Sequence, residues 1–305
     1  MDKENSLRPY LAGIAFTFIV GFSFLMIKVC IPFAGTIQIM TYRFDFAFIG
    51  VAFMWVLHRK NRSSEKGGSK KALIIPASFY IGCLALQTAG LVYSTSVEAT
   101  IIFAVSPLMV QIIASVFFKE KSTGIQIFFV ILSAAALVVM VVVGNKMTVD
   151  MRGVVLLILA ALSMAMYSVT GRYFSGKFEP FDLTTVIIIE GVFVFNAVTL
   201  ISGLRTGDIA NYFAPLANWK FTAAAIYLGV GCIMLSAQLM NYMLKKLHAV
   251  NASIFGNAST LVTILAGVLI IGESLRLYQV LCAAAILAGV IGVSVSGEKQ
   301  RRLEQ

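Results

Sequence analysis

The sequence predicts an all-α membrane protein with ten transmembrane helices in two inverted five-helix repeats. Of the 305 residues, 59% are hydrophobic and only 12% are charged, and the mean hydropathy is +0.90. A soluble protein of this composition would lack the polar side chains needed to cover its surface. Apolar runs of about the 20 residues that a helix needs to cross a bilayer recur along the chain, and its two halves resemble each other.

Ten apolar runs are predicted to span the membrane. They cover residues 9–29, 36–57, 73–94, 97–118, 124–143, 153–173, 182–203, 221–243, 250–271 and 276–296. Each is expected to be a helix, because every backbone amide in hydrocarbon needs a hydrogen-bond partner within its own segment or in a closed barrel. The runs are too long and too uniformly apolar to be the alternating strands of a barrel.

The first five runs differ in what they carry. The run 9–29 is longer than the apolar core of a secretory signal and no small-x-small cleavage site follows it, so we interpret it as a retained span. The second run contains Arg43 and Asp45, whereas the third and fifth contain no charged residue. In the fourth run Pro107 removes one backbone hydrogen bond, which predicts a static kink or a hinge at the transport pathway.

The last five runs repeat this plan. Arg172 closes the sixth run and is expected to reach the headgroups, and Glu190 lies near the middle of the seventh. The eighth and ninth runs hold a large share of the uncharged polar residues. In the tenth run Ala284, Ala288 and Gly292 form a stripe of small residues that permits close approach of another helix, within the chain rather than in a dimer interface.

The distribution of Lys and Arg predicts the orientation. Seventeen lie in the even-numbered gaps and the two termini, and six lie in the odd-numbered gaps. This asymmetry predicts that both termini are cytoplasmic, and we expect the plasma membrane as the location. The basic residues form short tufts beside apolar runs, so the net charge of +10 does not indicate nucleic-acid binding. Residues 58–71 are expected to form a flexible cytoplasmic loop, and Tyr212 and Trp219 to lie at the headgroup level in an outer loop.

An internal repeat supports the count of ten. A shift of 153 residues places KEKSTGIQ on GESLRLYQ, and with it Glu120 on Glu273. A shift of 144 residues places Lys28 on Arg172. Because each half has five helices, the second half must enter the membrane from the opposite side, which is the arrangement of many secondary transporters.

Short ordered motifs also resemble a known family. They are GFSFLMIK in the first helix, YRF in the second, AT, SPL and KE around the fourth, and NAS, AST and GE in the second half. They resemble the EamA domain of the drug/metabolite transporter superfamily, as two tandem domains at residues 9–143 and 153–296. The resemblance implies gradient-driven export or exchange of small organic metabolites such as amino acids or drug-like solutes, with no cofactor, in a monomer or homodimer. No Walker A sequence is present, which agrees with transport without ATP.

Charged residues inside the spans are the first candidates for function, because a charge near the centre of a helix costs at least about 2.5–3.5 kcal/mol. Glu190 and Asp45 fall at nearly equivalent depths in the two halves. Either one is predicted to carry a proton or to contact a cationic group of the substrate. The alternative is a structural ion pair in which Arg43 neutralises an acid on a neighbouring helix.

Uncharged polar residues within or near the spans are expected to line the cavity in part and to hydrogen bond between helices in part. They are Gln87, Tyr93, Ser106, Gln111, Tyr167, Thr170, Asn196, Gln238, Asn241, Tyr242, Asn257 and Thr260.

Two other functional classes were compared with a carrier. An intramembrane enzyme acting on lipid or peptide would need a catalytic motif, and the chain has no HExxH, GxSxG or paired-Asp metal motif. A channel would need an uninterrupted polar path, whereas the polar residues here are scattered among apolar ones. The four cysteines show no paired spacing, which predicts packing thiols and neither disulfides nor a metal site.

Overall fold

The structure is a computed structural model that describes residues 3–57, 70–117, 123–145, 150–175, 178, 180–206, 212–246 and 249–303. This part of the chain is mainly helical and holds no β-strand. The helices are α1 (Lys3–Gly21), α2 (Ser23–Cys30), α3 (Thr36–Leu57), α4 (Ile74–Val92), α5 (Ser96–Phe103), α6 (Ser106–Phe117), α7 (Gly124–Asn145), α8 (Met151–Ser175), α9 (Pro180–Thr206), α10 (Trp219–Ile226), α11 (Ser236–Lys246), α12 (Ala249–Ala266) and α13 (Leu277–Leu303). Short 3-10 segments η1 (Lys70–Leu73) and η3 (Ala214–Ala217) and π-helical segments η4 (Tyr227–Leu235) and η5 (Gly267–Ile271) complete them.

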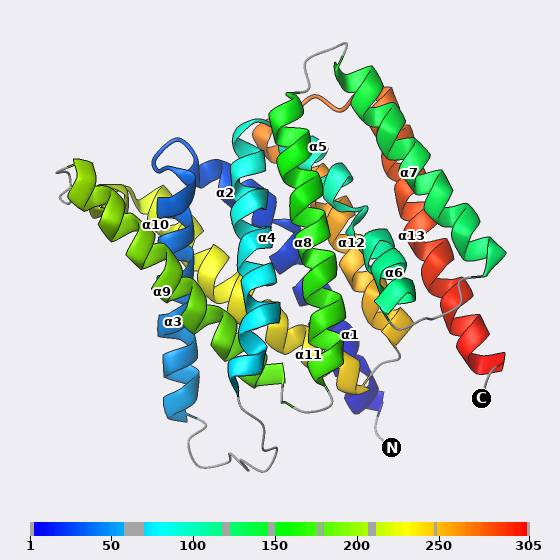
Figure 1. Cartoon of the computed structure of the whole chain (residues 1–305), viewed down its shortest axis with the longest axis horizontal. Coiled ribbons are helices and arrows are strands. Elements are labelled where there is room, and N and C mark those ends of the chain that lie inside the picture. Colours follow the sequence, from blue (N-terminus) through cyan, green and yellow to red (C-terminus); the bar gives the residue numbers. More distant parts are fainter. Residues whose placement is uncertain are drawn as a thin grey trace.

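The described residues form ten apolar spans, as predicted. Seven are long enough to cross a membrane, and three shorter apolar helices lie at Gly124–Met140, Ala258–Ile271 and Leu277–Gly292. The first turn of α1 and the last turn of α13 lie at the same end of the bundle (Figure 1), as an even number of spans requires. This end is called the terminal end below, and the opposite one the far end.

The helices of four spans are interrupted. The sequence predicted an interruption only at Pro107. The first is divided at Phe22 into α1 and α2, and the fourth is divided before Pro107 into α5 and α6. Pro107 therefore breaks its helix, because it cannot donate the hydrogen bond that would continue α5. The eighth span contains η4, and the ninth ends in η5, closed by Gly272 at φ +77°, a left-handed conformation that favours glycine.

The two halves pack as an inverted repeat. In Figure 1, α1 starts at the terminal end of the bundle, whereas α8, the first helix of the second half, starts at the far end. The contact of α4 with α8 has its counterpart in the contacts of α10 and α11 with α2 and α1. Likewise α3 packs on η4 and α9 packs on α4. Each half therefore places its equivalent helices against the other half in the same way.

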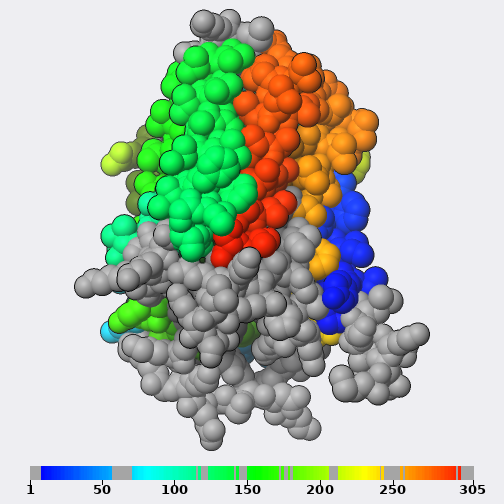
Figure 2. All heavy atoms as spheres, turned by 90° about the vertical axis from the view of Figure 1, so that its right-hand side faces the viewer, coloured from blue at the N-terminus to red at the C-terminus, as the bar shows by residue number. Residues whose placement is uncertain are grey.

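The fifth and tenth spans pair along one side of the molecule, where α7 and α13 lie side by side (Figure 2). A Cβ atom on Gly292 would lie 2.4 Å from the Phe129 ring, and one on Gly289 would lie 2.8 Å from the Phe129 carbonyl oxygen. The expected close approach occurs within the chain, but Ala284 and Ala288 do not make it. Both are exposed, because the face of α13 that meets α7 contains the two glycines.

Repeat-related residues also cap equivalent helices. The Gln126 side chain accepts a hydrogen bond from the Thr123 backbone N–H at 2.8 Å, at the start of α7. Gln279 accepts one from the Arg276 backbone N–H at 2.9 Å, at the start of α13. The shift of 153 residues therefore relates two caps of the same design, each of which satisfies a free donor at a helix N-terminus.

Candidate functional site

Arg43 lies at the meeting point of the two halves. On α3, its backbone touches η4 so closely that a Cβ atom on Gly229 would lie 2.4 Å from the Arg43 carbonyl oxygen. Its side chain is only 3% exposed. The guanidinium is within electrostatic range of Cys30 on α2, Cys83 on α4 and Cys232 on η4. The absence of a side chain at residue 229 is what lets α3 and η4 meet at this depth.

The Arg43 guanidinium has no protein partner for two of its nitrogens. Its Nε and Nη1 atoms are buried and make no hydrogen bond with any part of the chain that the structure describes. The predicted structural ion pair between Arg43 and a neighbouring acid is therefore not present among these residues. Buried charged donors are normally hydrogen bonded, because an unpaired one costs much of its hydration free energy.

Asp45 is held by a polar cluster of α3, α9 and the segment before η3. Its Oδ1 atom accepts a hydrogen bond from Asn196 Nδ2 at 2.7 Å. The Tyr212 hydroxyl lies 3.2 Å from Asp45 Oδ2 and 3.0 Å from Asn196 Oδ1, and can donate to either. The Tyr212 carbonyl in turn accepts hydrogen bonds from Gln38 Nε2 and from the Tyr42 hydroxyl. Both Asp45 oxygens thus lie within hydrogen-bond distance of a donor, and the cluster joins three segments of chain.

The Tyr212 hydroxyl points inward to this carboxylate, although the residue was predicted only as a headgroup-level side chain of an outer loop. Burial, followed by the negative charge of Asp45, raises the pKa of Tyr212 above its ordinary value. The phenol therefore remains a proton donor at neutral pH. Trp219, by contrast, is 74% exposed, as a headgroup residue would be.

Glu190 lies where α9 packs against α4. Its Oε1 atom is 2.5 Å from the Ser78 hydroxyl, and its Oε2 atom is buried with no hydrogen-bond partner in the described chain. The same hydroxyl lies 3.0 Å from the Ile74 carbonyl oxygen. Ser78 has one proton for two acceptors, so a protonated Glu190 that donates to Ser78 satisfies all three groups.

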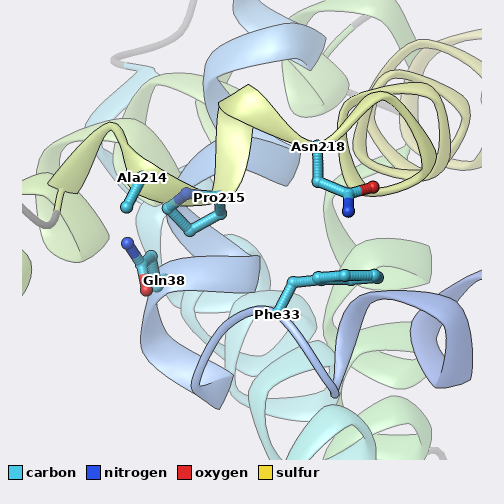
Figure 3. A pocket seen from close by; sticks show the side chains of 5 residues that line it. All are labelled: Phe33, Gln38, Ala214, Pro215 and Asn218. Carbon is cyan, nitrogen blue, oxygen red and sulfur yellow. The ribbon is translucent and has the colours of Figure 1, made fainter.

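A pocket opens at the far end of the bundle, between the turn that joins α2 to α3 and the segment η3 (Figure 3). Its volume is about 310 Å³. Its lining residues are Phe33, Gln38, Ala214, Pro215 and Asn218. Gln38, which donates to the Tyr212 carbonyl, links this pocket to the cluster around Asp45.

The other predicted residues are described by the burial of their side chains. Gln87 and Ser106 are buried, and Gln111, Tyr167, Thr170, Gln238 and Thr260 are half-buried. Tyr93 and Tyr242 are exposed, and Tyr93 lies under the Arg152 guanidinium at 4.6 Å. The side chains of Asn241, Asn257 and Arg172, the residue Glu120 and most of the loop 58–71 lie outside the described residues.

Some polar partners were not predicted. Tyr80 pairs with Tyr167, with ring centroids 4.9 Å apart, and Ser78 meets Glu190. Ser78 and Tyr80 both lie in the third span. They are two residues apart, which is not a helical spacing, so the sequence pattern did not select them. Only the position of an acid on the opposing helix, which requires the fold, identifies Ser78.

Glu273, which follows the ninth span, makes a polar contact with the start of the fourth. Its carboxylate accepts hydrogen bonds from the backbone N–H groups of Ser96 at 2.8 Å and Val97 at 2.9 Å, at the start of α5. Lys28 is half-buried and within electrostatic range of Glu273 and Glu98. The Glu273 carboxylate therefore holds the N-terminus of α5, which belongs to the first half of the chain.

The arrangement offers a buried cation, a carboxyl that can hold a proton, and a pocket at one end of the bundle. The EamA-like transporter family model matches residues 7–142 and 151–295. The uncharacterized transporter YcxC of Bacillus subtilis is 33% identical over 99% of this chain and 97% of its own length. An uncharacterized transporter of Archaeoglobus fulgidus is 23% identical over 88% of this chain and 92% of its own length. A protein crystal structure superposes with a TM-score of 0.62 at 15% identity, over 94% of this chain and 97% of that chain, which shows the shared fold.

Proposed function

The chain belongs to the EamA-like transporter family and is a transmembrane transporter, not an enzyme; from this premise we propose that it is a secondary-active carrier. It exports or exchanges small organic metabolites, such as amino acids or drug-like solutes, by alternating access. The inverted packing of the two halves carries this proposal. Two equivalent halves can exchange conformations and so open a site between them to one side and then to the other.

In this proposal Glu190 couples transport to protons. Three features support the assignment: the short contact with Ser78, the buried Oε2 atom without a partner, and the partial exposure of both side chains on an apolar bundle. A carboxylate beside hydrocarbon is costly, so the neutral acid is favoured until the site meets water. Among the described residues, no basic side chain forms an ion pair with Glu190.

The remaining candidates are assigned by position. The half-buried side chains of the fourth, sixth, eighth and ninth spans are proposed to line the solute path, with Asp45 holding the Tyr212 segment beside it. The two repeats are proposed to extend over residues 9–143 and 153–296. Both termini are proposed to be cytoplasmic in the plasma membrane, which would turn the pocket of Figure 3 outward, and the carrier to act as a monomer or homodimer.

Counterflow in proteoliposomes tests the carrier. Liposomes loaded with an unlabelled solute should transiently concentrate the same labelled solute, and the uptake should saturate. A channel gives no concentration step and an enzyme changes the solute. Uptake that rises linearly with concentration would count against the proposal.

The coupling role is tested by Glu190→Gln, with Ser78→Ala as the matched control. Glu190→Gln should keep counterflow, which needs no proton gradient, and lose or re-tune the pH dependence of net transport. Ser78→Ala retains the carboxyl group and should shift the pH profile without flattening it. An unchanged profile in Glu190→Gln would dismiss Glu190 as the proton carrier.

A further inference from the structure

We propose that Arg43 binds a carboxylate group of the transported solute, so that the carrier moves organic acids or zwitterions rather than amines. The inference rests on the proposed function, because it assigns the substrate class of the site between the two halves. Its starting point is the guanidinium described above, which is 3% exposed and leaves Nε and Nη1 without a partner among the described residues.

The acids nearest in the fold do not complete this site. Asp45 is two residues from Arg43, and its two oxygens lie within hydrogen-bond distance of Asn196 Nδ2 and the Tyr212 hydroxyl. Glu190 hydrogen bonds to Ser78. The groups that face Arg43 from α2, α4 and η4 are thiols and the Tyr80 phenol, all of which are neutral at pH 7.

A buried cation surrounded by neutral groups is incomplete by itself. Its removal from water is compensated only when an anion approaches with good hydrogen-bond geometry. A carboxylate meets this need, because guanidinium–carboxylate hydrogen bonds are short and strong. The neighbouring Tyr80 and Tyr167 rings, which keep part of their surface accessible, add an apolar wall for the body of the solute.

A pocket lies on the same helix as this site, nearer the far end of the bundle. The pocket of Figure 3 is lined by Gln38 on α3, the helix that carries Arg43. Five residues separate the two positions, which is about 7.5 Å along the helix axis and about 140° around it, so the two side chains leave different faces of α3. Tyr42 lies between them in the sequence. Its ring centroid is 5.4 Å from that of Tyr212 and 5.5 Å from that of Phe221.

Thermal unfolding of the purified protein tests the site with paired probes. The pairs are L-phenylalanine and L-phenylalaninamide, benzoate and benzamide, and succinate and succinamide. At least one acid should raise the melting temperature of the wild type with concentration, as a ligand of the native state does, and its amide should not. Arg43→Gln should weaken the apparent Kd for that acid about ten- to hundred-fold. Arg43→Lys, which keeps the charge, should retain the preference for acid over amide at lower affinity.

The ligand-free proteins give an independent readout. If Arg43 awaits a solute anion, Arg43→Gln without ligand should be as stable as the wild type or more stable, because an uncompensated charge has gone. A purely structural arginine predicts a lower melting temperature for that variant. The site is overturned if no acid shifts the wild type, if the shift persists in Arg43→Gln, or if the ligand-free variant is less stable.

Counterflow separates this inference from the proposed function. Counterflow of an amide or an amine that no acid inhibits would refute the carboxylate site and leave the carrier intact. Absence of counterflow for every solute would refute the carrier itself. Counterflow of an acid that Arg43→Gln abolishes would support both.

Discussion

Replacing Glu273 by Gln should weaken the contact between the ninth span and the start of α5. The carboxylate accepts hydrogen bonds from two consecutive backbone N–H groups, at 2.8 Å and 2.9 Å. Gly267 makes room for it, because a Cβ atom at residue 267 would lie 2.9 Å from Glu273 Oε2. The amide of Gln has the same shape but only one accepting oxygen, and its NH₂ group would face a donor.

The size of the effect follows from this geometry. A hydrogen bond to a charged group contributes about 1.5–3 kcal/mol, and one of the two is lost. A negative charge at a helix N-terminus adds about 0.3–1 kcal/mol, which is lost as well. Glu273→Gln should therefore lower the free energy of unfolding by about 2–4 kcal/mol.

Equilibrium unfolding in mixed micelles, with SDS as the denaturant, measures this difference. Glu98→Gln is the matched control on the same helix. Glu98 forms a capping box with Thr95, whose N–H it accepts at 3.1 Å, and Gln also serves in that role. The control should cost less than about 1 kcal/mol. If the two variants lose equal stability, or if Glu273→Gln matches the wild type, the carboxylate does not hold α5.

Three further outcomes follow from the packing. Gly289→Ala should destabilise the α7–α13 pair by about 1–3 kcal/mol in the same assay, because its Cβ would meet the Phe129 carbonyl oxygen, whereas Gly124→Ala, with open space around it, should be neutral or stabilising. Tyr212→Phe should cost about 1.5–3 kcal/mol through the lost hydrogen bond to a carboxylate, and the exposed Tyr242→Phe less than about 0.5 kcal/mol; equal losses would contradict the cluster. The four buried free cysteines should resist a membrane-impermeant maleimide until SDS unfolds the protein, and labelling of the folded protein would contradict their burial.

The number and position of the spans were predictable because the bilayer imposes one length and one hydrogen-bonding rule on every helix. The second and seventh spans begin at Thr36 and Pro180, and the fifth and tenth at Gly124 and Leu277. These pairs differ by the 144 and 153 residues at which the sequence repeats. Hydropathy alone could not locate the break at Phe22 or the π-helical segment η4. Both depend on how closely a neighbouring backbone approaches, and that is a property of the assembled bundle.

The candidate site was predictable in part. Burial cost selects charged residues inside spans without knowledge of the fold, and Arg43, Asp45 and Glu190 were found in that way. Their partners were less accessible to such reasoning. Ser78 and Tyr212 lie in other spans or loops, and a serine or tyrosine there is common for unrelated reasons. Which polar residue meets which acid depends on helix rotation, and apolar residues all around each span leave that rotation undetermined.

The comparison of the two halves separates what the fold requires from what a carrier requires. Features that build the fold recur at equivalent positions: the caps of Gln126 and Gln279 are one example. The charges of Arg43 and Glu190 do not recur. Under the shift of 144 residues Arg43 corresponds to the buried Ile187, and Glu190 corresponds to Phe46. Where one half carries a charge, the other half packs an isoleucine or a phenylalanine at the equivalent position, so the fold by itself does not need either charge. The asymmetry therefore favours transport chemistry as the reason for both charges, a guanidinium for the solute in one half and a carboxyl for the proton in the other.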